Sequence, residues 1–150
     1  MQIRKATLED AEAIWRLHHR SVLSLCAADY TSEQIANWVQ HSTLARQQAR
    51  LKKHRVFVAE EEGHLIGFVR WNPATFELCS LFVDPDFVRR GVASALMETA
   101  CQDARACGVT KFWLDASLTA VPFYTATGWQ TIKQMMHGEL ACVRMTKQLE

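Results

Sequence analysis

The sequence predicts an α/β fold in which a mixed sheet carries helices on both faces. Short runs rich in β-branched and aromatic residues alternate with longer segments whose apolar residues recur at helical spacing. Three consecutive strands in the middle of the chain are joined by short turns and should pair antiparallel. A helical segment separates the third of these strands from the next one, and such a crossover joins parallel strands. The expected order is β-α-α-β-β-β-α-β-α-β-β, which differs from a strict alternation of strands and helices.

The N-terminal part should contribute one strand and two helices. Residues 2–6 form the strand, and Thr7 caps the first helix with Asp10 in a capping-box-like position three residues later. Residues 26–30 form a loop, and Thr31 begins the second helix in the same way. The residues expected to face inward from these helices are Ile14, Leu17, Ser21, Leu25, Ile35, Trp38 and Val39.

The remaining elements are delimited by turn and cap residues. The expected strands are residues 56–59, 65–71, 76–83, 109–116, 129–135 and 140–146. A helix should begin at Gly91 or Val92 and end near Gly108, where glycine favours a C-terminal stop. A short helix over residues 119–127 is closed by Gly128.

Composition favours one globular domain over residues 1–150. The chain of 150 residues is 49% hydrophobic and 22% charged, and its formal net charge of +1 gives no global field toward nucleic acid or membrane. No apolar run has a membrane-spanning length, and the first ten residues lack a signal-peptide core. The five cysteines, without C-x-x-C spacing, indicate reduced thiols of a cytoplasmic protein. The six histidines form no metal-binding motif, so no metal is expected.

The segment 76–99 carries the clearest functional signal. Its strand ends at Val83, the turn Asp84-Pro85-Asp86 follows, and Arg89, Arg90 and Gly91 precede a helix. The first N–H groups of a helix lack intrahelical partners and lie at the positive end of its dipole, so phosphate binds well there. A single glycine is a weaker signal than G-x-G-x-x-G or a Walker A loop, and neither of those is present.

Two motifs resemble the GNAT superfamily of N-acetyltransferases. The family's pyrophosphate loop reads Q/R-x-x-G-x-G/A, and residues 88–93 match it except that Val88 stands for Gln or Arg. The family pattern FY-x-x-x-G-F fits residues 123–129, with Trp129 in place of phenylalanine. Many members carry asparagine seven residues before the tyrosine, where this chain has Ser117. The element order agrees with the family along the whole chain.

The resemblance implies a GNAT-like sheet, mostly antiparallel with one splayed parallel pair, and acetyl-CoA as co-substrate without a metal. Residues 81–83 would pair with the pantetheine arm through their backbone, and their N–H groups could stabilise the oxyanion that develops during transfer. The residues expected to bind the cofactor are Leu81, Phe82, Val83, Val88, Arg89, Arg90, Gly91, Val92, Ala93, Ser94, Ser117 and Tyr124.

Acetyl transfer to an amine also needs a base and an acid. Glu77 is the preferred base, because histone-type members of the family carry a basic glutamate at this spacing from the loop; the alternative is a solvent-facing strand residue. Asp84 and Asp115 are weaker candidates for the base, and Asp84 suits the Asp-Pro turn better. Tyr124 is the expected acid, because its phenol can donate a hydrogen bond to the leaving thiolate.

The acceptor is less well defined by the sequence. The leading interpretation is an N-acetyltransferase acting on a small-molecule amine. The alternatives are a non-catalytic acyl-CoA sensor and an enzyme acting on protein or tRNA amines. The sequence leaves open whether the protein forms a homodimer. The basic run over residues 46–55 could bind an acidic substrate or nucleic acid, but a solvated helix end is the preferred interpretation. By resemblance, Tyr30 and Trp38 flank a loop that borders the acceptor pocket.

Overall fold

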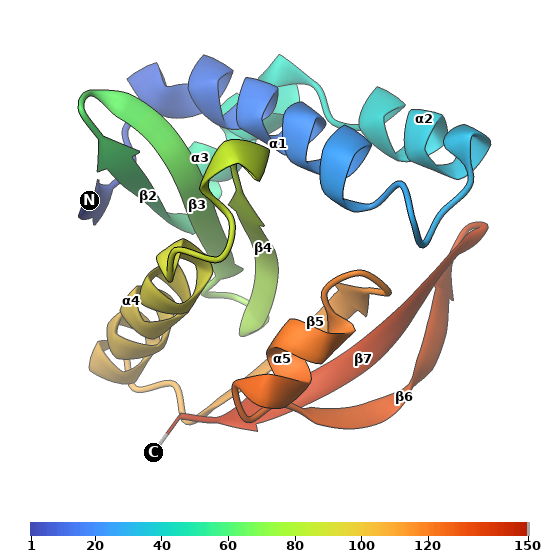
Figure 1. Ribbon diagram of the computed structural model, residues 1–150. Helices are drawn as coiled ribbons and strands as arrows, with labels where there is room; N and C mark the ends of the chain where they lie inside the picture. Colours follow the sequence, from blue (N-terminus) through green and yellow to red (C-terminus); the bar gives the residue numbers. More distant parts are fainter. Residues whose placement is uncertain (150) are drawn as a thin grey trace.

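The computed structural model describes residues 1–149 and is built around one seven-stranded sheet (Figure 1). Its strands are β1 (Gln2–Lys5), β2 (Arg55–Glu61), β3 (His64–Asn72), β4 (Glu77–Val83), β5 (Lys111–Ser117), β6 (Gln130–His137) and β7 (Leu140–Gln148). They lie in the order β1-β2-β3-β4-β5-β7-β6. The pair β4–β5 is parallel and the other neighbouring strands are antiparallel, so the predicted mixed α/β sheet is confirmed.

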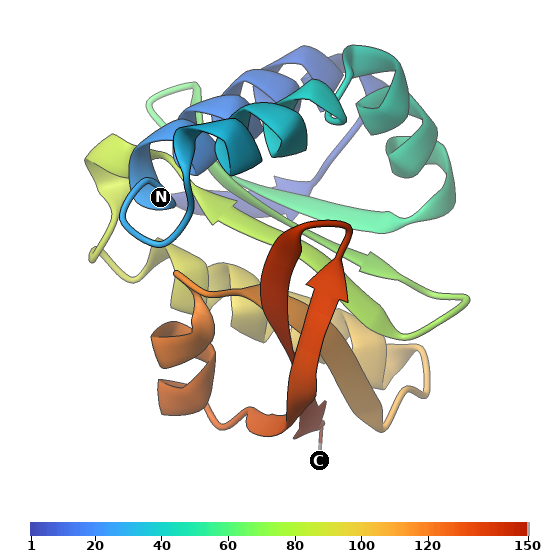
Figure 2. The same ribbon diagram turned by 90° about the vertical axis from the view of Figure 1, so that its right-hand side faces the viewer.

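Helices cover both faces of the sheet. They are η1 (Leu8–Asp10), α1 (Ala11–Leu25), α2 (Ser32–Gln40), α3 (Leu44–Lys53), η2 (Pro85–Phe87), α4 (Val92–Ala106) and α5 (Val121–Ala126). Figures 1 and 2 show α1, α2 and α3 on one side of the sheet and α4 on the other. Alternate residues of β2 explain this arrangement: Val56 and Val58 pack with Ile14 of α1, whereas Ala59 belongs to the core beneath Leu96 of α4.

The structure corrects the expected number of helices before β2. The sequence predicted two, but a third helix, α3, contains most of the basic run over residues 46–55. Its N-cap is Thr43, whose hydroxyl accepts a hydrogen bond from the Arg46 N–H at 3.2 Å. The capping box of Thr7 and Asp10 is present, since the Thr7 N–H donates to the Asp10 carboxylate at 2.7 Å, but Thr7 caps the turn η1 and Asp10 is the N-cap of α1. The 3-10 turn η1 intervenes between Thr7 and α1.

The parallel pair β4–β5 separates after a single paired position, Glu77 with Trp113. Beyond this position β4 continues to Val83 and β5 to Ser117, but the two strands do not pair with each other again. The edge of β4 that faces β5 therefore offers backbone N–H and C=O groups that this sheet does not use. In Figure 1, β4 runs upward from its paired end toward α1, whereas β5 lies beside α5 in the lower part of the view.

Other expectations concerned cysteines and membranes. The five cysteines are free thiols, and Cys26, Cys101 and Cys142 are buried. Over residues 1–149, no helix is both long enough and apolar enough to cross a bilayer.

Candidate active site

A cavity of about 650 Å³ occupies the space opened by the separation of β4 and β5. One side is formed by the end of β4, the start of α4, β5 and α5. The helices α1, α2 and α3, which cover the face of the sheet away from α4 (Figures 1 and 2), also contribute lining residues, as does Arg70 of β3, the strand next to β4. A volume of this size is typical of pockets for small molecules and cofactors.

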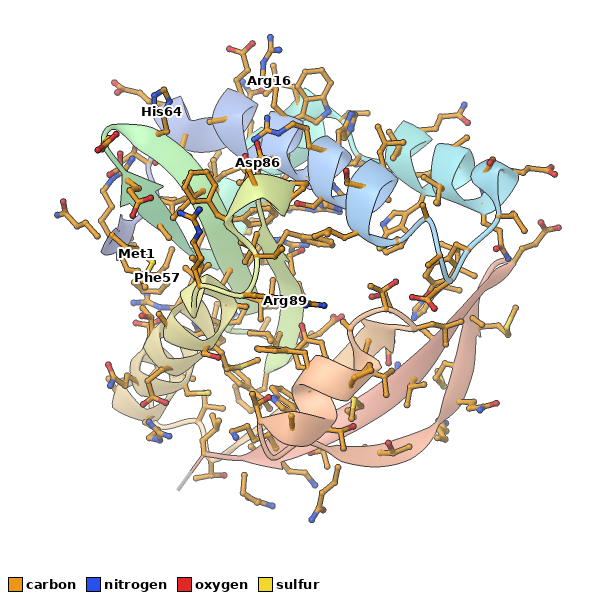
Figure 3. The ribbon with its side chains drawn as sticks, viewed as in Figure 1. Met1, Arg16, Phe57, His64, Asp86 and Arg89 are labelled. Carbon is orange, nitrogen blue, oxygen red and sulfur yellow. The ribbon has the colours of Figure 1, made fainter. Side chains whose placement is uncertain are left out.

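The loop before α4 is shaped for an anion. Arg89 and Gly91 both have left-handed backbone conformations, with φ of 64° and 80°. The Ala95 N–H donates to the Gly91 carbonyl at 3.0 Å, so the N–H groups of the three residues before Ala95 have no partner within the helix. These groups lie at the positive end of a 15-residue helix. Figure 3 shows the Arg89 side chain directed from this loop toward the space between β4 and α5.

Most of the residues predicted to bind the cofactor lie around this one cavity. Those that line it are Leu81, Phe82, Val83, Val88, Arg89, Gly91, Val92, Ala93, Ser94, Ser117 and Tyr124. Arg90 is outside the lining, because its guanidinium lies over the Phe87 ring at 5.0 Å from the centroid. Phe87 itself lines the cavity.

Tyr124 reaches the cavity from the short helix α5. Its ring packs edge-on against Phe123 and Trp129, with centroids 5.4 and 5.6 Å away. Burial raises the pKa of the Tyr124 phenol, so the hydroxyl stays protonated at neutral pH. Within residues 1–149, no hydrogen bond engages this hydroxyl, which leaves its proton available to a ligand.

The three candidate bases differ in their position relative to the cavity and in their hydrogen-bond partners. Glu77 is half-buried at the paired end of β4 and does not line the cavity. Burial, and then the nearby Asp115 carboxylate, raise the pKa of Glu77. Asp115 lines the cavity, but the Arg144 guanidinium donates to both of its oxygens and lowers its pKa. Asp84 accepts from the Asp86 N–H at 3.0 Å, in keeping with a role in the turn.

One group of side chains has the spacing of metal ligands. Asp115, His137 and Cys142 each place a ligand atom within 4.8 Å of the others. Arg144 donates to Asp115 at 2.8 and 3.0 Å, and His137 lies 2.7 Å from the same carboxylate. Asp115 therefore already has a positively charged hydrogen-bond partner in Arg144.

The wall opposite α4 contains residues that sequence reasoning did not assign. Arg46 and Arg50 of α3 line the cavity, which corrects the interpretation of the basic run as only a solvated helix end. Arg70 of β3 also lines it and is buried. The available signal was an arginine inside the otherwise apolar run of β3, but its face of the sheet could not be read from the run alone.

Two aromatic residues expected near the acceptor pocket have different roles. Trp38 lines the cavity, whereas Tyr30 lies beside it. The Tyr30 hydroxyl donates to the Ala141 carbonyl at 2.8 Å and accepts from the Leu118 N–H at 2.8 Å. Tyr30 therefore joins the loop before α2 to the ends of β5 and β7.

Comparisons with known proteins agree with this site. A family model described as an acetyltransferase (GNAT) domain matches residues 26–149, so the chain belongs to the GNAT family. It is 33% identical to the uncharacterized N-acetyltransferase YafP of Escherichia coli K12 over 134 residues, which is 89% of this chain and 84% of YafP. The protein described here is therefore an acyltransferase that depends on acetyl-CoA.

Solved structures show the same fold. A GCN5-related N-acetyltransferase from Rhodopseudomonas palustris superposes with a TM-score of 0.91 and 29% identity, over 98% of this chain and 94% of that one. The PaiA N-acetyltransferase of Thermoplasma acidophilum, solved with coenzyme A, superposes with a TM-score of 0.86 and 19% identity over 98% of both chains. The free N–H groups of α4, Gly91 and Arg89 are a donor set that suits the pyrophosphate of coenzyme A.

Proposed function

We propose that this enzyme transfers an acetyl group from acetyl-CoA to the primary amine of a small molecule by direct attack. The observation that carries the proposal is one cavity that joins three features: the start of α4, the unpaired edge of β4, and the hydroxyl of the buried Tyr124. Each feature meets one requirement of the reaction, and the far wall leaves room for an acceptor.

The first requirement is to hold the co-substrate. The N–H groups of Val92, Ala93 and Ser94 bind the pyrophosphate, and Arg89 adds a positive charge. The backbone of residues 81–83 pairs with the pantetheine arm as an added strand would. When bound, acetyl-CoA supplies an activated acyl thioester. The same β4 N–H groups then stabilise negative charge on the acyl oxygen.

The second requirement is a neutral amine. An alkyl ammonium with a pKa of about 10.4 costs about 4–5 kcal/mol to deprotonate at pH 7. Glu77 is the proposed base, because its raised pKa makes it a stronger proton acceptor than an ordinary carboxylate. Since Glu77 does not line the cavity, a water molecule would relay the proton. Asp84 and Asp115 are weaker candidates because both accept hydrogen bonds from arginine.

The third requirement is a proton donor for the leaving thiolate. Tyr124 is protonated at neutral pH and lines the cavity from the side of β5 and α5. Its phenol has a higher pKa than the thiol, so it stabilises the thiolate mainly by donating a hydrogen bond. A hydroxyl that is free to reach the thiolate favours an enzyme over a sensor without catalytic activity.

A small acceptor is favoured over a macromolecular one by the size of the cavity and by a net charge of only +1. The five free thiols suit a reducing compartment, and we infer a cytoplasmic enzyme.

The test is a panel of small primary amines, peptides and tRNA, each incubated with enzyme and acetyl-CoA, with release of free CoA thiol as the signal. We expect at least one small amine to accelerate thiol release well above the rate without acceptor. If only peptides or tRNA accelerate release, the acceptor is a macromolecule and this proposal is wrong.

A further inference from the structure

Three arginines converge on the cavity wall that faces away from α4. Arg46 and Arg50 are four residues apart on α3 and therefore share one face of the helix. Arg70 projects from β3 and is only 7% exposed. The two elements are joined by His54, whose Nδ1 lies 2.6 Å from the Arg70 guanidinium.

Within the described part of the chain, these arginines lack the carboxylate partners that six other arginines have. Arg4 and Arg55 form ion pairs with aspartates at 2.8 and 2.5 Å. None of the ion pairs formed within residues 1–149 includes Arg46, Arg50 or Arg70.

The hydrogen bonds of the guanidinium groups are also incomplete. Arg70 donates to the Ser80 hydroxyl at 3.1 Å, but its buried Nε has no partner among the described residues. Arg46 donates to the His41 carbonyl at 2.9 Å. Burying a guanidinium without a counter-charge costs folding free energy. A bound anion would offset that cost and accept the hydrogen bonds that the guanidinium does not make within the protein.

The surroundings of the three arginines supply little negative charge. Within residues 1–149, Asp115 is the one carboxylate that lines the cavity, and Arg144 and His137 already engage it. Glu77 lies near Arg70 but outside the lining. His18 lines the cavity beside the arginines, and its Nδ1 lies 2.8 Å from the Ser42 hydroxyl. The concentration of positive charge is local, because the net charge of the whole chain is only +1.

We propose that the acceptor is an anionic primary amine whose carboxylate or phosphate is held by Arg46, Arg50 and Arg70. The proposal rests on the proposed function, since it names the substrate class for the same cavity. Arginine presents a fork of N–H donors that matches both kinds of oxyanion. The phosphates of the co-substrate are assigned to the start of α4, which covers the other face of the sheet from α3 (Figures 1 and 2), so the arginine cluster is free for the acceptor. An anion held there fixes one end of the acceptor and leaves its amine to point toward β4 and Tyr124.

The experiment measures binding of matched amines to the enzyme–coenzyme A complex by calorimetry. This complex carries no acetyl group, so the measurement does not need turnover, and its cofactor site is filled. One pair is glucosamine 6-phosphate with glucosamine, and the other is β-alanine with β-alaninamide. We expect the anionic member of at least one pair to bind about 10- to 100-fold more tightly, as for hydrogen bonds to a charged group. The two pairs distinguish a phosphate from a carboxylate.

Variants locate the effect. Arg50→Gln should remove most of the preference for the anionic member; Arg50 is only partly buried, so the fold should persist. Arg70→Lys retains a charge in place of the guanidinium and should reduce the preference without removing it. The control is Arg16→Gln, because Arg16 lies on the outer side of α1 and pairs with Glu12 (Figure 3). It should leave the preference unchanged.

The outcomes separate this inference from the proposed function. Equal or tighter binding of the neutral members, or failure of every anionic member to bind, overturns the inference even if neutral amines are acetylated. A preference for anions that persists in Arg50→Gln and Arg70→Lys also overturns it. Binding of anionic amines without thiol release from acetyl-CoA for any amine would retain the inference and contradict the proposed function.

Discussion

Replacing Tyr124 with phenylalanine removes one oxygen atom from the proposed acid and little else. The ring keeps its contacts with Phe123 and Trp129, at centroid distances of 5.4 and 5.6 Å. The hydroxyl makes no hydrogen bond within residues 1–149, so its loss should leave the free energy of unfolding nearly unchanged. Any effect on activity should therefore report its contact with the reacting groups.

The size of the effect follows from the state of the phenol. Burial raises its pKa, so Tyr124 acts as a hydrogen-bond donor to the thiolate rather than losing its proton completely. A hydrogen bond to an anion contributes about 1.5–3 kcal/mol. Since about 1.4 kcal/mol corresponds to a factor of ten in rate, kcat should fall about 10- to 150-fold. The affinity for acetyl-CoA should change little.

The assay is release of CoA thiol at saturating acetyl-CoA, together with calorimetry for cofactor affinity. The control is the other tyrosine, Tyr30, whose hydroxyl bonds with Ala141 and Leu118. Tyr30→Phe should lower the melting temperature by several degrees while kcat falls much less. An unchanged kcat in Tyr124→Phe would refute the reasoning and assign that tyrosine to packing.

Three further substitutions test other parts of the structure. Gly91→Glu should weaken acetyl-CoA binding in calorimetry by at least about 100-fold, because it places a negative charge at the phosphates and a side chain at φ 80°. The control is Gly63→Glu, at φ 79° in a hairpin, which introduces the same backbone strain and should bind acetyl-CoA normally. Glu77→Gln should lower kcat/KM most near neutral pH and recover partly as pH rises, because more amine is then neutral; a mutant pH–rate profile parallel to that of the wild type would exclude Glu77 as the base. Hydrogen bonds from Arg4 lower the pKa of Asp10, so the stabilisation that ionised Asp10 gives the fold is present above about pH 4 and is lost as pH falls through its folded-state pKa. Asp10→Asn should lower the free energy of unfolding at pH 7 by about 1–3 kcal/mol and make that free energy decline less steeply in acid. The same decline in acid as in the wild type would contradict this.

The parts of the site that could be predicted from the sequence are contiguous in the chain. The residues around Gly91 form one strand–turn–helix unit, so local spacing was enough to place them beside a single cavity. The same holds for Tyr124, which precedes the helix-closing Gly128 by four residues. The departure of Arg90 toward the Phe87 ring could not be read from the sequence, because either arginine of the loop could have faced the cavity.

The acceptor side depends on contacts between distant segments. Arg50 and Arg70 come together because α3 packs over the face of the sheet on which Arg70 projects. A register irregularity in the β3–β4 ladder between Arg70 and Trp71 interrupts the simple alternation of faces there. The helix α3 was missed because its start at Thr43 follows α2 closely, although Thr43 carries a cap signature.

Hydrogen–deuterium exchange with and without acetyl-CoA tests the central claim most directly, namely that the cavity between β4 and β5 holds the co-substrate. The N–H groups at residues 92–94 have no partner within the helix and should exchange rapidly in the free enzyme. We predict that acetyl-CoA slows exchange over residues 81–94 and 117–124, and leaves the β2–β3 hairpin around Gly63 unchanged. Saturating acetyl-CoA that protects neither of these two segments would contradict the account.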